Sequence, residues 1–181
     1  SKLFKAKQIP WDDIPGLIWR EGTNVRMNPR VMVEDLDKLE FPSWDLMHPA
    51  TYPDTPQGCF YRNFPIAPIS TSRGCPYLCT FCGSSVNMGR KLRLRSIKNV
   101  LGEMDMLYYD FGVREFHIID DMFNFHKERI FELCQGLKDR KWNISYTFPN
   151  GLRLNHLDKE ILRIMKDTGL YAFTVGIESG S

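Results

Sequence analysis

The sequence has no long apolar run, no strong excess of charge of either sign and no even set of cysteines. Without a stretch of about 18 apolar residues, no membrane span is expected. The first residues, SKLFKAKQIPW, lack the apolar segment and small-residue cleavage site of a secretory leader. A formal net charge of +2 predicts neither a nucleic-acid nor a polyanion partner. Five cysteines, an odd number, argue against a disulfide framework and for a reducing compartment, so we expect a cytoplasmic protein.

The first 62 residues differ in composition from the rest of the chain. They contain seven of the eleven prolines and three of the four tryptophans. The run GLIWREGTNVRMN predicts a short hairpin that turns at residues 21–24, and residues 33–58 offer turn signals with little periodicity. We therefore expect residues 1–62 to form a hairpin and linker that packs on a neighbour, and not a self-sufficient domain.

From residue 63 onward, apolar strand-like runs alternate with amphipathic helical segments. Strands are expected at 64–71, 114–120, 143–148 and 171–179, and helices at 96–112, 126–140 and 158–168. Helices between successive strands imply right-handed βαβ crossovers and a parallel sheet, hence an α/β fold. Since the chain stops at Ser181, directly after the fourth strand, the sheet would have an open edge. We expect either a fragment of a longer protein or a barrel that is only partly represented.

Three cysteines, Cys75, Cys79 and Cys82, lie within eight positions of the run TSRGCPYLCTFCGSS. On a helix this spacing would place all three on one face, as a buried stripe. The neighbouring glycines and proline disfavour a helix interior, however, so a ligand-bearing loop is the better interpretation.

The choice of metal depends on how many ligands the chain supplies. Structural zinc requires four, usually as two C-x2-C pairs, and only one such pair is present here. A fourth ligand would have to come from scattered residues, which are Cys59, Cys134, His48, His117, His126 and His156. Of these, Cys134 lies in the apolar stripe of a predicted helix and is better interpreted as a small buried hydrophobe. Three thiolates on an iron–sulfur cluster would leave one iron open, which favours a cluster that binds a substrate or cofactor.

The motif C-x3-C-x2-C, with Phe81 before the last cysteine and the strand-like run FPIAPIST before the loop, resembles the signature of radical S-adenosylmethionine (radical SAM) enzymes. The resemblance runs from about residue 64 to the end of the chain. It implies a partial (βα) barrel of the radical SAM type, truncated after the fourth strand. It also implies a 4Fe-4S cluster held by Cys75, Cys79 and Cys82, whose open iron chelates S-adenosylmethionine (SAM). Reductive cleavage of SAM would then give a 5′-deoxyadenosyl radical.

The resemblance also implies SAM-binding residues at the carboxyl ends of the strands. The pair Asp120-Asp121 lies where the family holds the SAM ammonium group, although the family often has Gly-Gly-Glu there; alternatively, one Asp caps the next helix. Arg153 would pair either with the SAM carboxylate or with a structural acid. Glu178 would accept hydrogen bonds from the ribose hydroxyls or be a solvated surface residue. The basic run GRKLRLRS, residues 89–96, is interpreted as a solvated approach to the first helix, with binding of a phosphate or a redox partner as the alternative.

The hairpin and linker are similar to those of radical SAM proteins that carry an upstream cobalamin-binding domain. This subgroup implies cobalamin in the full-length protein, most simply a cobalamin-dependent methyltransferase, with a ring-forming enzyme or a methylthiotransferase as alternatives. A reducing donor such as flavodoxin or ferredoxin is then expected, and the substrate stays unknown. Outside the family, the rivals are an electron-transfer iron–sulfur protein and a zinc-stabilised interaction module. We expect the 181-residue chain alone to be poorly active, because half of the pocket wall would be absent.

Overall fold

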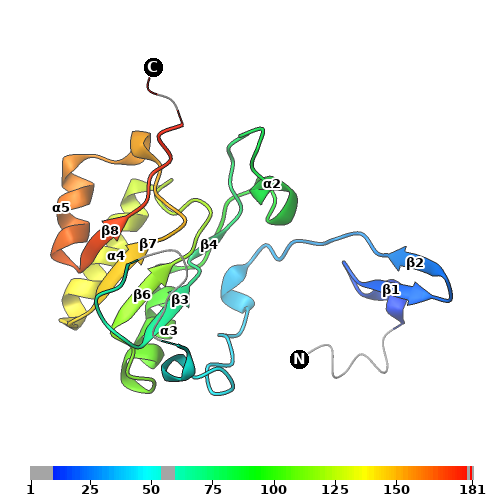
Figure 1. The fold of residues 1–181 in the computed structure, drawn as a ribbon, viewed down its shortest axis with the longest axis horizontal. Helices are drawn as coiled ribbons and strands as arrows, with labels where there is room; N and C mark the ends of the chain where they lie inside the picture. The colour runs from blue at the N-terminus through cyan, green and yellow to red at the C-terminus, as the bar shows by residue number, and fades with distance from the viewer. Residues whose placement is uncertain (1–9, 54–59, 179, 181) are drawn as a thin grey trace. The chain divides into compact units, whose positions relative to one another are not determined.

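The computed structural model describes residues 10–53, 60–178 and 180 (Figure 1). The chain divides into two compact units, Ser1–Glu34 and Asp35–Ser181, and each is considered by itself.

The described part of the first unit is an antiparallel hairpin. Strand β1 (Ile18–Glu21) pairs with β2 (Asn24–Met27), and Glu21 lies opposite Asn24 across a two-residue turn. Gly22 opens that turn with a positive φ of 61°, a conformation that glycine adopts without steric cost. A short 3-10 helix, η2 (Trp11–Asp13), precedes β1. The predicted hairpin is therefore confirmed.

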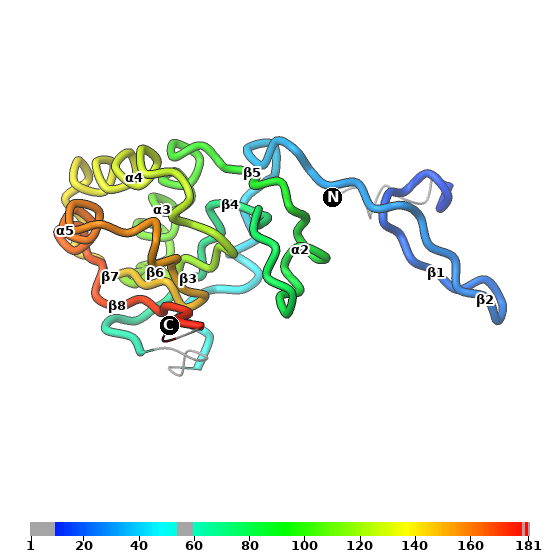
Figure 2. Tube along the Cα trace, turned by 90° about the horizontal axis from the view of Figure 1, so that it is seen from above, coloured from blue at the N-terminus to red at the C-terminus, as the bar shows by residue number. Residues whose placement is uncertain are grey.

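The second unit is built on a four-stranded parallel sheet. The strand order is β3 (Ile66–Ile69), β6 (Glu115–Ile118), β7 (Ser145–Phe148) and β8 (Leu170–Phe173), and each neighbouring pair is parallel. Helices α3 (Ile97–Tyr109), α4 (Lys127–Arg140) and α5 (Lys159–Asp167) connect the successive strands and lie on one face of the sheet (Figure 2). The expected α/β fold with βαβ connections is confirmed.

Local signals fix the helix boundaries close to where the sequence places them. Ser96 begins α3, and its hydroxyl accepts a hydrogen bond from the Asn99 amide at 3.1 Å. Asp158 begins α5 in the same way, by accepting from the Ile161 amide at 2.8 Å. The last strand is shorter than the expected 171–179, since β8 ends at Phe173 and the described residues that follow are irregular. The described residues of the unit also form short 3-10 helices: η3 (Leu36–Lys38), η4 (Pro49–Thr51) and η5 (Leu154–His156).

The core lies between the sheet and the three helices. Alternate strand residues face the helices and are almost completely buried: Ala67, Ile69, Phe116, Ile118, Tyr146 and Phe148. Cys134 of α4 packs among them with 1% of its surface exposed, and burial raises the pKa of its thiol. Its interpretation as a small hydrophobe is confirmed. In the described parts of the chain, no helix combines the length and the apolar character that crossing a bilayer requires.

Part of the segment before β3 is integral to this core. The Trp44 side chain is 8% exposed, and its indole N–H donates to Oε1 of Glu103 on α3 at 3.1 Å. Through Trp44, the segment before β3 is therefore anchored on helix α3 of the second unit.

A small antiparallel sheet closes the cysteine loop, and no pattern in the sequence predicts it. Strand β4 (Ser72–Arg73) pairs with β5 (Arg93–Leu94), and the short helix α2 (Ser84–Asn87) lies between them in sequence. Gly74 has a φ of 94°, and a Cβ there would lie 2.3 Å from the Lys91 carbonyl oxygen, so only glycine lets the two sides of the loop approach. The solvated interpretation of the basic run agrees with Arg90 and Lys91, which are exposed, but it is wrong for Arg93, which is buried and donates to the Met88 carbonyl.

Candidate functional site

The three cysteines lie in an irregular loop, as the neighbouring glycines and proline predict. Cys75 is half-buried, whereas Cys79 and Cys82 are exposed, and all three are free thiols. The Cys75 amide donates to the Gly89 carbonyl across the loop at 3.2 Å, and the Cys82 amide donates to the Cys79 carbonyl at 3.2 Å. One of these hydrogen bonds joins the two sides of the loop and the other forms a turn within it, so the backbone is held while the thiols of Cys79 and Cys82 stay exposed.

The thiols open onto a cavity of about 520 Å³ at the carboxyl ends of the strands. Seven of the eight residues that the sequence predicts for the site line this cavity: Cys75, Cys79, Cys82, Phe81, Asp121, Arg153 and Glu178. The eighth, Asp120, does not line it. The fold therefore gathers, from four separate loops, groups suited to bind a metal cluster and a charged cofactor.

The donor set fits a cluster better than a single metal ion. Among the described residues, no three His, Cys, Asp or Glu side chains are close enough together to hold one ion. In a cluster each thiolate binds a different iron, so the sulfurs need not converge on one point. Two residues after Cys82, the buried hydroxyl of Ser84 has no hydrogen-bond partner within the described chain, and the Ser84 amide donates to the Cys82 sulfur at 3.5 Å. Polar groups of this kind next to thiolates suit a bound inorganic group.

Most of the residues considered as a fourth zinc ligand have contacts of their own in the described structure. His48 accepts the Ala50 amide through Nδ1, and Nε2 of His117 lies 3.0 Å from Oε1 of Glu115. His156 is hydrogen-bonded to Tyr77, and Cys134 is in the core. The ring of His126 packs edge-on against Phe125, and Cys59 lies outside the described residues.

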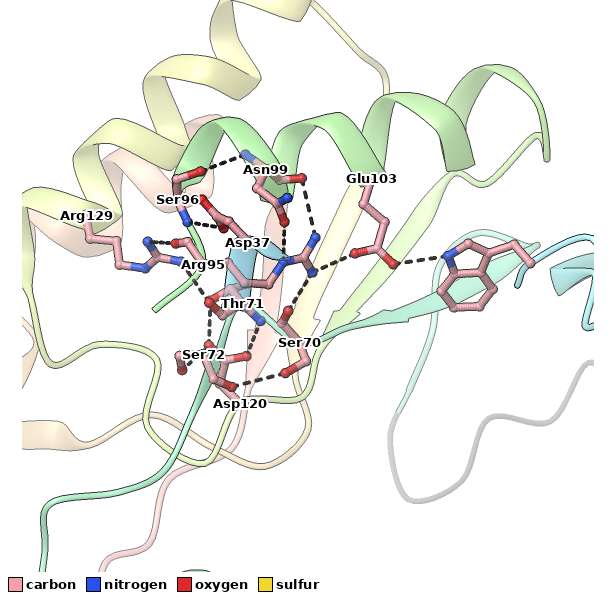
Figure 3. Close-up of polar contacts among 11 residues, drawn as sticks. Asp37, Ser70, Thr71, Ser72, Arg95, Ser96, Asn99, Glu103, Asp120 and Arg129 are labelled. Atoms are coloured by element: carbon pink, nitrogen blue, oxygen red, sulfur yellow. Dashed lines mark hydrogen bonds and ion pairs between the residues drawn. The ribbon is translucent and has the colours of Figure 1, made fainter. Parts of the chain in front are cut away.

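Asp120 is hydrogen-bonded to Thr71 and Ser72, which precede the cysteine loop, and so braces the start of that loop (Figure 3). One carboxylate oxygen accepts from the Thr71 amide at 2.6 Å, and the other accepts from the hydroxyls of Thr71 at 2.5 Å and Ser72 at 2.7 Å. The side chain is 3% exposed, and burial raises its pKa although these hydrogen bonds oppose the rise. The carboxylate therefore ties the end of β6 to the strand that leads into the cysteines.

Two arginines complete this support from the helix side (Figure 3). Arg129 of α4 donates to the carbonyl of Thr71 at 3.0 Å, and Arg95 donates to the carbonyl of Ser70 at 2.8 Å. Arg95 also forms an ion pair of 2.6 Å with Glu103, which is itself bonded to Trp44. Burial lowers the pKa of Arg129, although the nearby Asp120 carboxylate opposes that effect. Sequence reasoning missed both arginines, because nothing in their local pattern indicates their distant partners.

Asp121 points the other way from Asp120 and faces the cavity. Successive residues of an extended segment alternate in direction, so the two carboxylates of the pair serve different surroundings. Neither of them caps α4, since the residue at that helix N-terminus is His126, which makes no capping hydrogen bond. The alternative role as a helix cap is therefore wrong for both.

Arg153 meets the cysteine loop directly. Its guanidinium carbon lies 3.7 Å from the centroid of the Tyr77 ring, and its Nε donates to the Asn155 side chain at 3.1 Å. Within the described residues no ion pair joins Arg153 to a carboxylate, so the structural acid considered from the sequence is not found there. Its charge is presented to the cavity.

Glu178 also lies at the cavity, after β8, and is exposed. Its φ of 62° is unusual for a residue other than glycine and directs the backbone out of the extended form. The carboxylate is therefore available to a ligand with hydroxyl groups.

Comparisons with known proteins agree with this geometry. The family model described as the radical SAM superfamily matches residues 69–181. An uncharacterized methyltransferase, PH0819, of Pyrococcus horikoshii is 32% identical over 99% of the chain and 37% of its own length. Cytidylyl-2-hydroxyethylphosphonate methyltransferase of Streptomyces wedmorensis is 29% identical over 93% of the chain and 36% of its own length. Anaerobic magnesium-protoporphyrin IX monomethyl ester cyclase of Cereibacter sphaeroides is 27% identical over 93% of the chain and 27% of its own length.

A solved structure shares the fold. The radical SAM methyltransferase TsrM of Kitasatospora setae, solved with cobalamin and a [4Fe-4S] cluster bound, superposes with a TM-score of 0.57 at 21% identity. The match covers 62% of this chain and 22% of that protein. The chain thus spans well under half of the length of each of these relatives.

Proposed function

The chain belongs to the radical SAM superfamily, and from this premise we propose that it is part of a cobalamin-dependent radical SAM methyltransferase. The family implies a 4Fe-4S cluster and SAM as cofactors. When bound, the cluster supplies the electron that cleaves SAM to methionine and a 5′-deoxyadenosyl radical. In this proposal residues 63–181 form the radical SAM core, and residues 1–62 are an extension that follows a cobalamin-binding domain.

One observation carries the assignment of the cluster. The three thiols of Cys75, Cys79 and Cys82 open onto the same cavity as Phe81, and two of the three are exposed. We assign these cysteines as the three protein ligands, which leaves one iron for SAM. The braced backbone behind them holds the ligand loop in place before any metal arrives.

The remaining cavity residues are assigned to SAM by charge. Asp121 presents a carboxylate suited to the ammonium group, and Arg153 presents a guanidinium suited to the carboxylate. Glu178 has acceptor oxygens suited to the ribose hydroxyls. Asp120 is assigned to the brace, because both of its oxygens already accept hydrogen bonds within the protein.

A second cavity, of about 680 Å³, adjoins the first and is proposed to receive the substrate. Asn150 lines both cavities, so the two meet at the end of β7. The second cavity lies over the sheet face opposite the helices, and Ile66, Pro68 and His117 form part of its wall. A radical generated in the first cavity would therefore face a mostly apolar space across Asn150.

Cobalamin, the electron donor and the compartment are proposed for the whole protein. The methyltransferase relatives favour methyl transfer over the ring closure of the cyclase, since they include the matches of higher identity reported above. We propose a flavodoxin or ferredoxin as the reductant and the cytoplasm as the location, because exposed free thiols require a reducing environment.

The test is anaerobic reconstitution of the full-length protein with iron and sulfide, followed by low-temperature electron paramagnetic resonance (EPR) with and without SAM. We expect a reduced 4Fe-4S signal that changes on addition of SAM. The Cys82→Ala variant should lose the signal, whereas the matched control Cys134→Ala, in the core, should keep it. Release of 5′-deoxyadenosine and of S-adenosylhomocysteine should follow once cobalamin is supplied.

Each readout has an outcome that would overturn part of the proposal. A cluster that is indifferent to SAM, or a tetrahedral zinc ion, would remove the enzyme assignment. Release of 5′-deoxyadenosine without S-adenosylhomocysteine, in the presence of cobalamin, would retain the family chemistry and reject methyl transfer in favour of ring formation.

A further inference from the structure

Tyr77 lies between the first two cysteines and contacts two other loops of the site. Its hydroxyl is hydrogen-bonded to Nε2 of His156, which ends η5 after β7. The guanidinium of Arg153, from the same loop, lies over the face of its ring at 3.7 Å. Its ring edge also packs against Phe125, from the loop after β6, at 6.3 Å between centroids. The Tyr77 side chain thus contacts three residues that lie 48 to 79 positions after it in the sequence.

The loop after β7, which contacts Tyr77 through Arg153 and His156, is itself anchored. The side chain of Asn124, which is 1% exposed, donates to the Arg153 carbonyl at 2.8 Å and accepts from the Arg153 amide at 3.1 Å. This two-way contact fixes the backbone of Arg153 relative to the end of β6. The rings of Phe125 and His156 pack together at 5.6 Å. The β6 and β7 loops therefore form a rigid receptor for the Tyr77 ring.

The contact with Tyr77 also determines where the charge of Arg153 lies. A guanidinium over an aromatic face is held electrostatically by the ring quadrupole, and the attraction grows when water is excluded. Arg153 and Tyr77 both line the cofactor cavity, together with the three cysteines. Movement of the Tyr77 ring would therefore displace the cation that faces the cavity as well as the loop that carries the thiols.

We propose that Tyr77 is a positioning residue that aligns the cysteine loop with Arg153, through its ring to the guanidinium and through its hydroxyl to His156. The inference rests on the proposed function in one respect, which is that Arg153 faces SAM. The alignment itself is a property of the chain and does not require the cofactor.

The first experiment measures SAM binding to the reconstituted full-length protein from the SAM dependence of the EPR change. We expect Tyr77→Leu, which removes ring and hydroxyl, to raise the half-saturating SAM concentration about tenfold. Tyr77→Phe, which removes only the hydroxyl, should raise it about threefold to fivefold, and adding His156→Asn should give little further change. The controls are Tyr109→Leu and Tyr109→Phe, because Tyr109 also has a ring contact and a hydroxyl bond, both to Trp142 on the protein surface.

The second experiment is amide hydrogen exchange on the full-length protein without SAM. Tyr77→Leu should speed exchange about tenfold in residues 151–157 as well as in residues 75–83, because the two loops hold each other. A side chain with a purely local role would speed exchange in residues 75–83 alone, and that result would overturn the proposal.

The two experiments separate failure of this inference from failure of the proposed function. SAM binding within twofold of the unmodified protein in Tyr77→Leu, with iron content unchanged, would overturn the alignment. Strictly additive effects of Tyr77→Phe and His156→Asn would do the same. If the unmodified protein holds a cluster that ignores SAM, the proposed function fails, and coupled exchange between the two loops would still support the alignment. If Tyr77→Leu does not retain iron, the comparison of Tyr77→Phe with His156→Asn decides whether the alignment holds.

Discussion

Replacement of Asp120 tests the brace behind the cysteine loop most directly. Its carboxylate accepts three short hydrogen bonds, from the Thr71 amide, the Thr71 hydroxyl and the Ser72 hydroxyl. Hydrogen bonds to a charged group contribute about 1.5 to 3 kcal/mol each, so the three bonds give about 4.5 to 9 kcal/mol in total. Against this, burying a charge costs several kcal/mol, and burial is the largest cause of the raised pKa of Asp120.

The net effect should therefore be smaller than the sum of the bonds. We expect Asp120→Ala to lower the free energy of unfolding by about 2 to 4 kcal/mol, because it leaves the Thr71 amide unsatisfied and removes an anion near Arg129. Asp120→Asn keeps the volume and one acceptor oxygen for that amide, and the hydroxyls can rotate to accept from the new NH₂ group. It should cost about 1 to 2 kcal/mol.

The assay is urea unfolding at neutral pH, followed by circular dichroism, with Asp121→Ala as the matched control. Asp121 is exposed at the cavity, so its replacement should change stability by less than about 0.5 kcal/mol and should instead weaken SAM binding. A loss below about 1 kcal/mol for Asp120→Ala would refute the brace. Equal effects of the two alanine variants on stability would refute the division of roles within the pair.

Three further predictions concern buried groups around the sheet. Burial raises the pKa of Glu115, but hydrogen bonds from His117, Tyr171 and two backbone amides outweigh burial and lower the pKa below its ordinary value. The unmodified protein should therefore be more stable than Glu115→Gln above pH 4.5, and this difference should be lost as pH falls through the folded pKa. A difference in unfolding free energy that does not change with pH would contradict this. Gly74→Ala should lower the free energy of unfolding, measured by thermal unfolding, by more than about 2 kcal/mol. The control Gly112→Ala, at a position with a positive φ but open space around it, should lower it by about 1 kcal/mol. Equal losses would show that the close approach of Gly74 to the Lys91 carbonyl is unimportant. Trp44→Phe should cost about 1 kcal/mol by removing the N–H bond to Glu103, and an unchanged midpoint in urea would show that the extension adds no stability there.

Local patterns in the sequence were sufficient to predict the framework of the fold. Helices α3 and α5 begin at Ser96 and Asp158 because those side chains accept amide hydrogen bonds within one turn. The alternation of strands and helices requires a parallel sheet, since a helix between two strands returns the chain in the same direction. The position of the cysteine loop after β3 can also be read directly from the sequence, because the cysteines come shortly after that strand along the chain. The helix caps depend on contacts within one turn, and the order of strands and helices is read directly along the chain.

The roles of individual residues could not be predicted in this way. The residues of β6 and β7 alternate between polar and apolar in the sequence, and the apolar ones face the helices. Continued to residue 120, this alternation places Asp120 on the helix side of the sheet, but it does not identify Thr71 and Ser72 as the partners of the carboxylate. Arg129 and Thr71 are 58 residues apart, and Tyr77 and His156 are 79 residues apart, so no local pattern pairs them.

The spacing of residues along the chain is enough to predict three thiols in a loop at the end of a strand, within a βα fold of a recognisable family. Which side chains support that loop, and which charged groups line the cavity beside it, depends on how the sheet and helices pack. Thiol spacing and helix caps are set by neighbours along the chain, whereas the environment of a carboxylate or guanidinium is set by distant side chains that packing brings beside it.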